Sequence, residues 1–253
     1  MSTIKEHLLD VQSQRADEWI RERAADPELD ENSEEYEYLA DEYSAYQDHL
    51  WDEAEWQAEL KWLTENGSSN IHNIFMTELD ALKVLAESNQ ANKTKVVFIL
   101  HSDMAVKMSY AHAVTLLESF LGDTLKSIIS QNDCFLKNAI EKFKIFKNVK
   151  LSELIKTDLN INSLVNMYLS DVLFHNIPNV IEMYEQVLGV HLDINISKIV
   201  KITKLRHDIV HRNGRSIDGS AINLQYTDFS EAIEDIRTFS YELQKVINQA
   251  EAA

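Results

Sequence analysis

The segment of residues 205–214 concentrates more proton-transfer and anion-binding side chains than any other part of this chain. It reads Leu-Arg-His-Asp-Ile-Val-His-Arg-Asn-Gly, with two histidines, two arginines, an aspartate and an amide. Imidazole moves protons near neutral pH, and a guanidinium group binds phosphate or carboxylate. Apolar residues recur at helical spacing from residue 197 onward, and Asn213-Gly214 is a typical helix stop. The pattern predicts a helix over about residues 195–212, with His211 in its last turn.

This segment resembles the HEPN family of compact helical domains. Its ribonuclease members carry Arg, a polar residue, three further residues and then His, which here are Arg206, His207 and His211. A second match is residues 109–123, Ser-Tyr-Ala-His-Ala-Val-Thr-Leu-Leu-Glu-Ser-Phe-Leu-Gly-Asp, which is similar to an early core helix of that family with an inward acidic residue. Glu118 is the matching position. The resemblance covers roughly residues 96–250, and a lone Arg-x4-His string would carry little weight without the second helix.

The resemblance implies a metal-independent endoribonuclease and, as a cellular role, a toxin or phage-defence effector with an antitoxin or regulatory protein as a possible partner. Cleavage of RNA without a metal needs groups that move protons at the 2′-hydroxyl and the leaving 5′-oxygen, and fixed positive charge beside the phosphorane. His211 and Arg206 supply these types and are the expected catalytic residues. Some HEPN toxins carry a Tyr two places after the His, where this chain has Asn213, so regulation through such a Tyr is not expected.

Helical geometry separates the two expected catalytic residues. Five positions turn an ideal helix by about 500°, which leaves the side chains of Arg206 and His211 roughly 140° apart. One copy of the chain cannot easily direct both at one phosphate, whereas two copies can. HEPN ribonucleases pair their motif helices across a two-fold axis, so the resemblance implies a homodimer with a composite site for an RNA substrate.

The neighbouring residues have supporting or structural interpretations. Glu118 is expected to be buried and to pair with Arg206, and His207 to support Arg206. Asp208 is either a surface residue or a group that orients His211. Arg212 and Asn213 either contact phosphate or cap the helix, and Asn213-Gly214 favours capping. The alternative for the whole motif is a helix end in which Arg206 and His211 only bind Glu118 or backbone carbonyls, giving a non-catalytic scaffold that binds RNA or protein.

A zinc site is the third interpretation of the same segment. His207 and His211 lie four positions apart, as in the HExxH motif, so their side chains share a helical face. Asp208 replaces the glutamate of that motif, and no third ligand is obvious in the sequence. We therefore expect neither a metal site nor a cofactor.

The most basic segment is residues 137–150, in which five lysines alternate with aromatic and aliphatic residues. Such a run is usually a solvated helix face above its own core. It is also the best candidate for contacts with an RNA backbone. Lys142, Lys144 and Lys147, together with Arg215 in the loop after the motif, are the expected RNA-binding residues.

Composition predicts an all-α fold, in the form of a HEPN-like helical bundle with an acidic helical extension at the N-terminus. The 253 residues contain 45% hydrophobic residues but only 5 Gly and 2 Pro, and 3.6-residue periodicity dominates. Residues 96–100 are strand-like in isolation, but their apolar neighbours favour the start of a long buried helix. Further helices are expected over residues 1–25, 34–66, 71–89, 134–147, 151–157 and 161–188, the last with an interruption at residues 176–178, and from Asp228 to about residue 250.

Charge and turn residues suggest two parts, an extension of residues 1–66 and a HEPN-like domain of residues 71–253, joined by Asn-Gly-Ser-Ser-Asn. Residues 1–70 contain 20 acidic and 5 basic side chains, against 22 and 19 in residues 71–253. All four Trp occur by residue 62, and such aromatic surface, including Trp51 and Trp62, is expected to need a packing partner.

The remaining sequence features concern the cellular compartment. A single Cys, Cys134, excludes an internal disulfide and fits a reducing cytoplasm. The first residues have no apolar signal core, and no apolar run approaches the roughly 20 residues needed to cross a bilayer. We expect a soluble cytoplasmic protein with no membrane partner.

Overall fold

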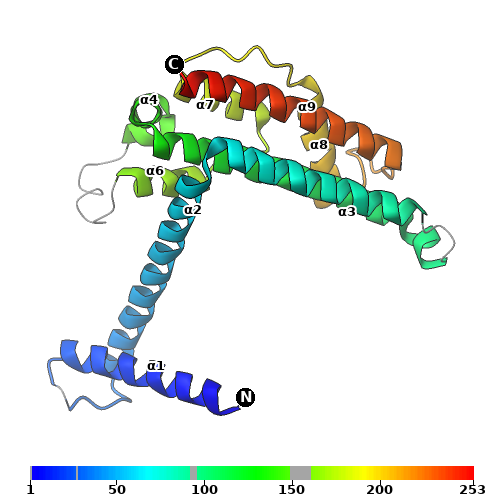
Figure 1. Cartoon of the computed structure of the whole chain (residues 1–253). Helices are drawn as coiled ribbons and strands as arrows, with labels where there is room; N and C mark the ends of the chain where they lie inside the picture. Colours follow the sequence, from blue (N-terminus) through cyan, green and yellow to red (C-terminus); the bar gives the residue numbers. More distant parts are fainter. Residues whose placement is uncertain (1, 27, 92–95, 149–160) are drawn as a thin grey trace. The chain divides into compact units, whose positions relative to one another are not determined.

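The computed structural model describes residues 2–26, 28–91, 96–148 and 161–253, and these ranges are built from helices (Figure 1). Their only β pairing is an isolated bridge between Arg215 and Ala221. The predicted all-α class is therefore confirmed for the described residues. The elements are α1 (Ser2–Arg23), α2 (Glu34–Ala91), α3 (Val96–Gln131), α4 (Asp133–Lys142), the 3-10 helix η1 (Lys144–Asn148), α6 (Ile161–Ser170), α7 (Ile177–Leu188), α8 (Ser197–His211) and α9 (Tyr226–Glu251).

Most helix ends follow local signals in the sequence. Asn132 accepts hydrogen bonds from the backbone N–H groups of the first turn of α4. Pro178 lies in the first turn of α7, and Gly189 ends that helix in the left-handed conformation. Residues 96–100 are helical, as expected. The helix predicted over residues 151–157 lies outside the described residues.

Helix α2 continues through the segment that was expected to be a linker. Only Gly67 departs from helical geometry, with φ 70° and ψ 168°, a region that is essentially restricted to glycine. The next residue, Ser68, is buried and donates a hydrogen bond to Glu251 at the end of α9. The turn-forming residues therefore produce a kink, because tertiary contacts keep the chain helical on both sides of Gly67.

The chain divides into two compact units, Met1–Ala58 and Glu59–Ala253. In the first unit, the ring of Trp19 on α1 packs on Tyr43 and Tyr46 of α2 at centroid distances of 5.3 and 5.8 Å. Trp51, however, is 73% exposed, so the expected packing partner for the aromatic residues covers only part of them.

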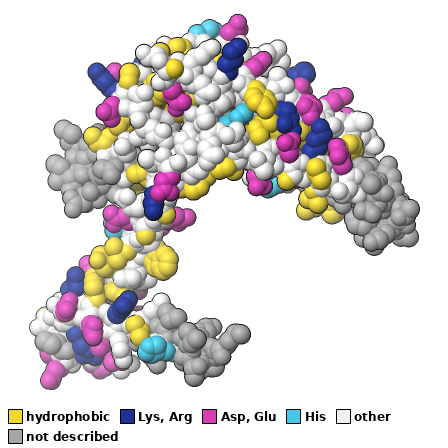
Figure 2. Space-filling model, viewed as in Figure 1, with side chains coloured by type: hydrophobic (Ala, Val, Ile, Leu, Met, Phe, Trp, Pro, Cys, Tyr) yellow, Lys and Arg dark blue, Asp and Glu magenta, His cyan; other side chains and the backbone are white. Residues whose placement is uncertain are grey.

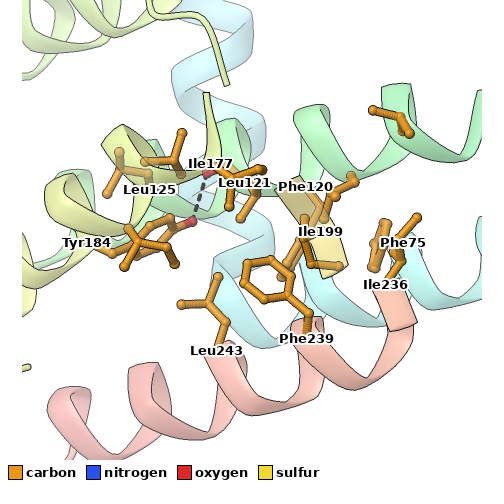
Figure 3. Close-up of a cluster of buried hydrophobic side chains, with 14 of the residues drawn as sticks. Phe75, Phe120, Leu121, Leu125, Ile177, Tyr184, Ile199, Ile236, Phe239 and Leu243 are labelled. Carbon is orange, nitrogen blue, oxygen red and sulfur yellow. Dashed lines mark hydrogen bonds between the residues drawn. The ribbon is translucent and has the colours of Figure 1, made fainter. Parts of the chain in front are cut away.

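The second unit is organised around α3. The part of α2 after Gly67 runs antiparallel to α9, and the pairs Arg237–Asp80, Lys83–Glu234 and Tyr226–Glu87 join the two helices. Figure 3 shows the core between these helices and α3, α7 and α8, where the Tyr184 hydroxyl donates a hydrogen bond of 2.7 Å to the carbonyl of Leu121. No helix in the described ranges is both long enough and apolar enough to span a membrane.

The two units place their border at 58/59, whereas the sequence suggests 66–71, and two deletions distinguish these borders. Removal of residues 1–58 should leave the second unit folded. Removal of residues 1–66 also takes away Leu63, which is fully buried, and Glu59, which accepts a hydrogen bond of 2.6 Å from the buried Lys126.

We expect the longer deletion to reduce the free energy of unfolding by at least about 3 kcal/mol relative to the shorter one, since loss of a buried leucine alone costs about 2–5 kcal/mol. Urea denaturation followed by circular dichroism measures the difference. Equal stability of the two truncated chains would favour the border predicted from the sequence.

Candidate active site

The motif helix α8 ends in a glycine-type cap. Asn213 and Gly214 both have positive φ, 52° and 71°. The Gly214 N–H donates to the carbonyl of Ile209 at 3.0 Å, six residues back by inclusive count, as in a Schellman cap. The following loop is fixed by a 2.8 Å bond from the Ile222 N–H to the Gly214 carbonyl. Asn213 thus has the capping position that its sequence favours.

His207 and His211 lie side by side at the surface of this helix end. Both residues are exposed, and their ring centroids are 4.7 Å apart with the planes inclined by 41°. The i, i+4 spacing places them on one helical face. The ring of His207 contacts that of His211, and the support of Arg206 by His207 stays a prediction.

Arg206 faces helix α3. Its Nη2 lies 3.5 Å from Oε2 of Glu118, and each side chain is 20% exposed. The predicted pair is therefore present, but half-buried rather than fully enclosed. Oε1 of Glu118 and Nε of Arg206 are buried and have no hydrogen-bond partner among the described residues. The two side chains are joined by a single long contact, and each keeps a polar atom that forms no hydrogen bond with another described residue.

Asp208 forms an ion pair with Arg212, one turn further along α8. The Asp208 side chain is only 14% exposed, whereas that of Arg212 is 36% exposed. Among the described residues, no hydrogen bond joins Asp208 to His211, and the Asp208 carboxylate instead pairs with Arg212. Each arginine of the motif therefore has a carboxylate partner.

The observed directions agree with the helical geometry. Arg206 is held against α3, whereas the imidazole of His211 is at the solvent-exposed surface. A separation of five positions, about 500° of rotation, accounts for this difference. Within one chain, the expected positive charge and the expected proton-transfer group do not converge on one point.

The expected RNA-binding lysines lie elsewhere in the second unit. Lys142, Lys144 and Lys147 are exposed on α4 and η1, and Lys142 donates to the carbonyl of Gln186 near the end of α7. Figure 1 shows α4 where the chain leaves α3, away from the middle of α3 that contacts α8. Arg215, by contrast, is exposed directly after the motif. On the face shown in Figure 2, basic side chains are interspersed with acidic ones and form no continuous basic surface.

Helix α3 contributes a residue that the sequence reasoning missed. Lys107 forms a 2.7 Å ion pair with Asp103 and approaches Gly214 at the end of α8. A groove of about 350 Å³ lies here, with the exposed Met104 and Met108 on its α3 side. Lys107 and Glu118 are eleven positions apart, about 1100° of helix, so they share a face of α3. The spacing of eleven positions between Lys107 and Glu118 was the signal in the sequence that could have identified Lys107.

Two further findings concern metal binding and similarity to known proteins. Among the described residues, no group of three or more His, Cys, Asp or Glu side chains is arranged to hold a metal ion. Comparison with protein-family models, with curated proteins and with solved structures found no match.

The half-buried Arg206–Glu118 pair should be energetically coupled more strongly than an exposed pair. A double-mutant cycle with Arg206→Gln and Glu118→Gln is expected to give a coupling of about 1–2 kcal/mol, because each single change leaves a poorly solvated charge unpaired. Urea unfolding of the four chains measures this quantity.

The matched control is Lys137–Glu141 on α4, a 4.0 Å pair whose side chains are 74% and 59% exposed. Its cycle should give less than about 0.5 kcal/mol because exposed charges are well solvated. Equal coupling in the two cycles would mean that Glu118 does not anchor Arg206.

Proposed function

We propose that this chain is a metal-independent endoribonuclease of the HEPN type, with Arg206 and His211 as its catalytic residues. The observation that carries the proposal is the pair of exposed imidazoles, His207 and His211, in the last turns of a helix whose Arg206 is anchored on Glu118. Proton-transfer groups and a positioned guanidinium group are what phosphodiester cleavage requires when no metal takes part.

The proposed reaction is a transesterification followed by release of the leaving strand. An imidazole accepts the proton of the RNA 2′-hydroxyl, and the 2′-oxygen attacks the adjacent phosphorus atom. The phosphorus–5′-oxygen bond then breaks, and an imidazolium donates a proton to the departing 5′-oxygen. The products are a 2′,3′-cyclic phosphate and a free 5′-hydroxyl. Arg206 stabilises the extra negative charge of the phosphorane.

A homodimer would bring the guanidinium groups and the imidazoles to one phosphate. In one chain, Arg206 is directed towards α3 and His211 is at the surface. If two α8 helix ends face each other, Arg206 and His211 of one copy join those of the other around one phosphate. We propose this composite site, and an RNA substrate for it, together with a role as a toxin or defence effector under the control of an antitoxin or regulatory protein.

A non-catalytic scaffold is the second candidate, and one observation favours it. Both motif arginines are paired with carboxylates, Arg206 with Glu118 and Arg212 with Asp208. Paired charges of this kind hold helices together without any reaction. In that case, the motif would stabilise a domain that binds RNA or protein, and substitution of His211 would leave the function unchanged.

Substitutions at the two catalytic positions test the proposal. His211→Ala and Arg206→Ala should each lower the rate of RNA cleavage by at least about 100-fold, the usual contribution of a proton-transfer group or a charge-stabilising donor. Cleavage by the unsubstituted chain should persist in EDTA and yield 2′,3′-cyclic phosphate ends, identified by mass spectrometry of the RNA fragments.

His49→Ala, at an exposed histidine of the first unit, is the matched control and should retain full activity. Arg206→Lys separates charge from geometry, since lysine keeps the charge but not the planar fork of donors. Full activity of the His211→Ala chain would contradict the catalytic role of His211, absence of cleavage by the unsubstituted chain would support the scaffold, and loss of cleavage on chelation would support a metal-dependent hydrolase.

Mixing of chains tests the composite site. When His211→Ala chains are mixed with unsubstituted chains and allowed to exchange, activity should fall below the value expected from dilution, because mixed dimers lack one of the required imidazoles. Activity assays at several mixing ratios, with mass measured by light scattering, give the answer. A monomer, or activity strictly proportional to the fraction of unsubstituted chain, would contradict a shared site.

A further inference from the structure

A polar cleft of about 530 Å³ lies between α2 and α9 of the second unit, within the size range of small-molecule sites. Its lining includes Ser69, His72, Tyr241, Gln244, Lys245 and Asn248. Phe120 of α3 contacts His72, two positions after Glu118, which pairs with Arg206. Two positions turn a helix by about 200°, so the cleft and the Arg206 side of α8 lie on opposite faces of α3.

Gln244 lines this cleft and has an unused acceptor. The residue is only 5% exposed, and its Oε1 atom has no partner among the described residues. Its Nε2 donates to Ser68 Oγ at 3.2 Å and to Asn248 Oδ1 at 2.8 Å. Because Ser68 donates its own proton to Glu251, it must accept from Gln244, so these bonds fix the amide orientation. A buried acceptor without a donor costs about 1–3 kcal/mol, which a ligand with an N–H group would recover.

His72 contributes an imidazole to the lining of the cleft. Its Nε2 atom lies 3.3 Å from the Ser240 hydroxyl, and the tautomer of the ring determines which of the two groups donates. Burial lowers the pKa of His72, which keeps the ring neutral at neutral pH. The unused acceptor of Gln244 and the uncharged ring of His72 therefore favour a ligand group that donates a hydrogen bond over an anion.

The rim of the cleft has different chemistry. The ring of Tyr241 is 55% exposed and makes a T-shaped contact with His72 at a centroid distance of 5.1 Å, so its exposed part offers aromatic surface for stacking. Lys245 is exposed, one position after Gln244, and no Asp or Glu is among the described residues that line the cleft. A ligand that matches both the wall and the rim of the cleft has a planar ring with an amino group and carries a negative charge.

We propose that this cleft binds an amino-substituted purine nucleotide unit, with the base stacked on Tyr241, its amino group donating to Gln244 and its phosphate beside Lys245. Two sources share this chemistry: a free mononucleotide and an unpaired adenine of single-stranded RNA. The second source rests on the proposed function and would make the cleft a substrate subsite. The first stands independently of it.

Isothermal titration calorimetry of the full chain tests the proposal with AMP as the probe. Purine riboside 5′-monophosphate differs from AMP only by lacking the amino group, and it should bind about tenfold more weakly, since Gln244 is again left without a donor. Tyr241→Ala should weaken binding of AMP about tenfold through loss of stacking. Tyr38→Ala, at a tyrosine that is 69% exposed in the first unit, is the matched control and should bind AMP normally.

A short oligoadenylate, titrated into the non-cleaving His211→Ala chain, distinguishes the two sources. Binding of AMP at least as tight as that of the oligoadenylate assigns the cleft to a free nucleotide. Binding of the oligoadenylate alone, lost in a chain that also carries Tyr241→Ala, assigns it to RNA. Binding of neither probe, or binding unaffected by both Tyr241→Ala and Lys245→Ala, would overturn the proposal. Because Arg206 is remote from the cleft, Arg206→Ala should leave AMP affinity unchanged even if the chain proves not to cleave RNA.

Discussion

Burial of helix α3 is the constraint on which the second unit depends. Val114, Leu117, Leu121 and Leu125 of this helix are fully buried, and helices α4, α6, α7, α8 and α9 all contact it. These residues form a strongly apolar face that the neighbouring helices must enclose, whereas Met104 and Met108 nearer the start of α3 are exposed. The positions of the motif helix and of the cleft between α2 and α9 are both consequences of this enclosure.

The polar residues of α3 determine how its neighbours are oriented. Lys126 is only 7% exposed and requires both Glu59 and Ser170 as hydrogen-bond partners, which ties the start of the second unit and α6 to α3. Glu118 does the same for α8 through Arg206, although over a longer distance of 3.5 Å. A misplaced neighbour would leave one of these charges poorly solvated, and that penalty favours one arrangement over others that bury similar apolar area.

Much of this fold follows from periodicity, and the exceptions have physical causes. The amphipathic spacing predicted the helices well, and the Arg206–Glu118 pair was expected from the motif. The linker expected at residues 66–70 is helical apart from Gly67, because the buried Ser68 has a partner, Glu251, more than 180 positions away. No local signal reports such a contact. The ring contact of His207 with His211 could not be predicted from the sequence either, because the i, i+4 spacing places two residues on one helical face but does not determine their rotamers.

The cleft between α2 and α9 could not be predicted from the sequence, for a related reason. Ser69, His72, Gln244 and Asn248 are polar residues at ordinary helical positions, and in a sequence they are indistinguishable from a solvated helix face. Their chemistry emerges only when two antiparallel helices bring an unused amide oxygen and a neutral imidazole to one wall. At the motif the reverse holds, since the residue types are conspicuous but two carboxylates already balance the two arginines. If the proposed reaction takes place at the end of α8, attraction of the phosphate from a distance must come from the exposed imidazoles, from Arg215 or from a second copy of the same helix end, whereas Arg206 would act at contact, because neutralised pairs exert little force beyond their immediate neighbours.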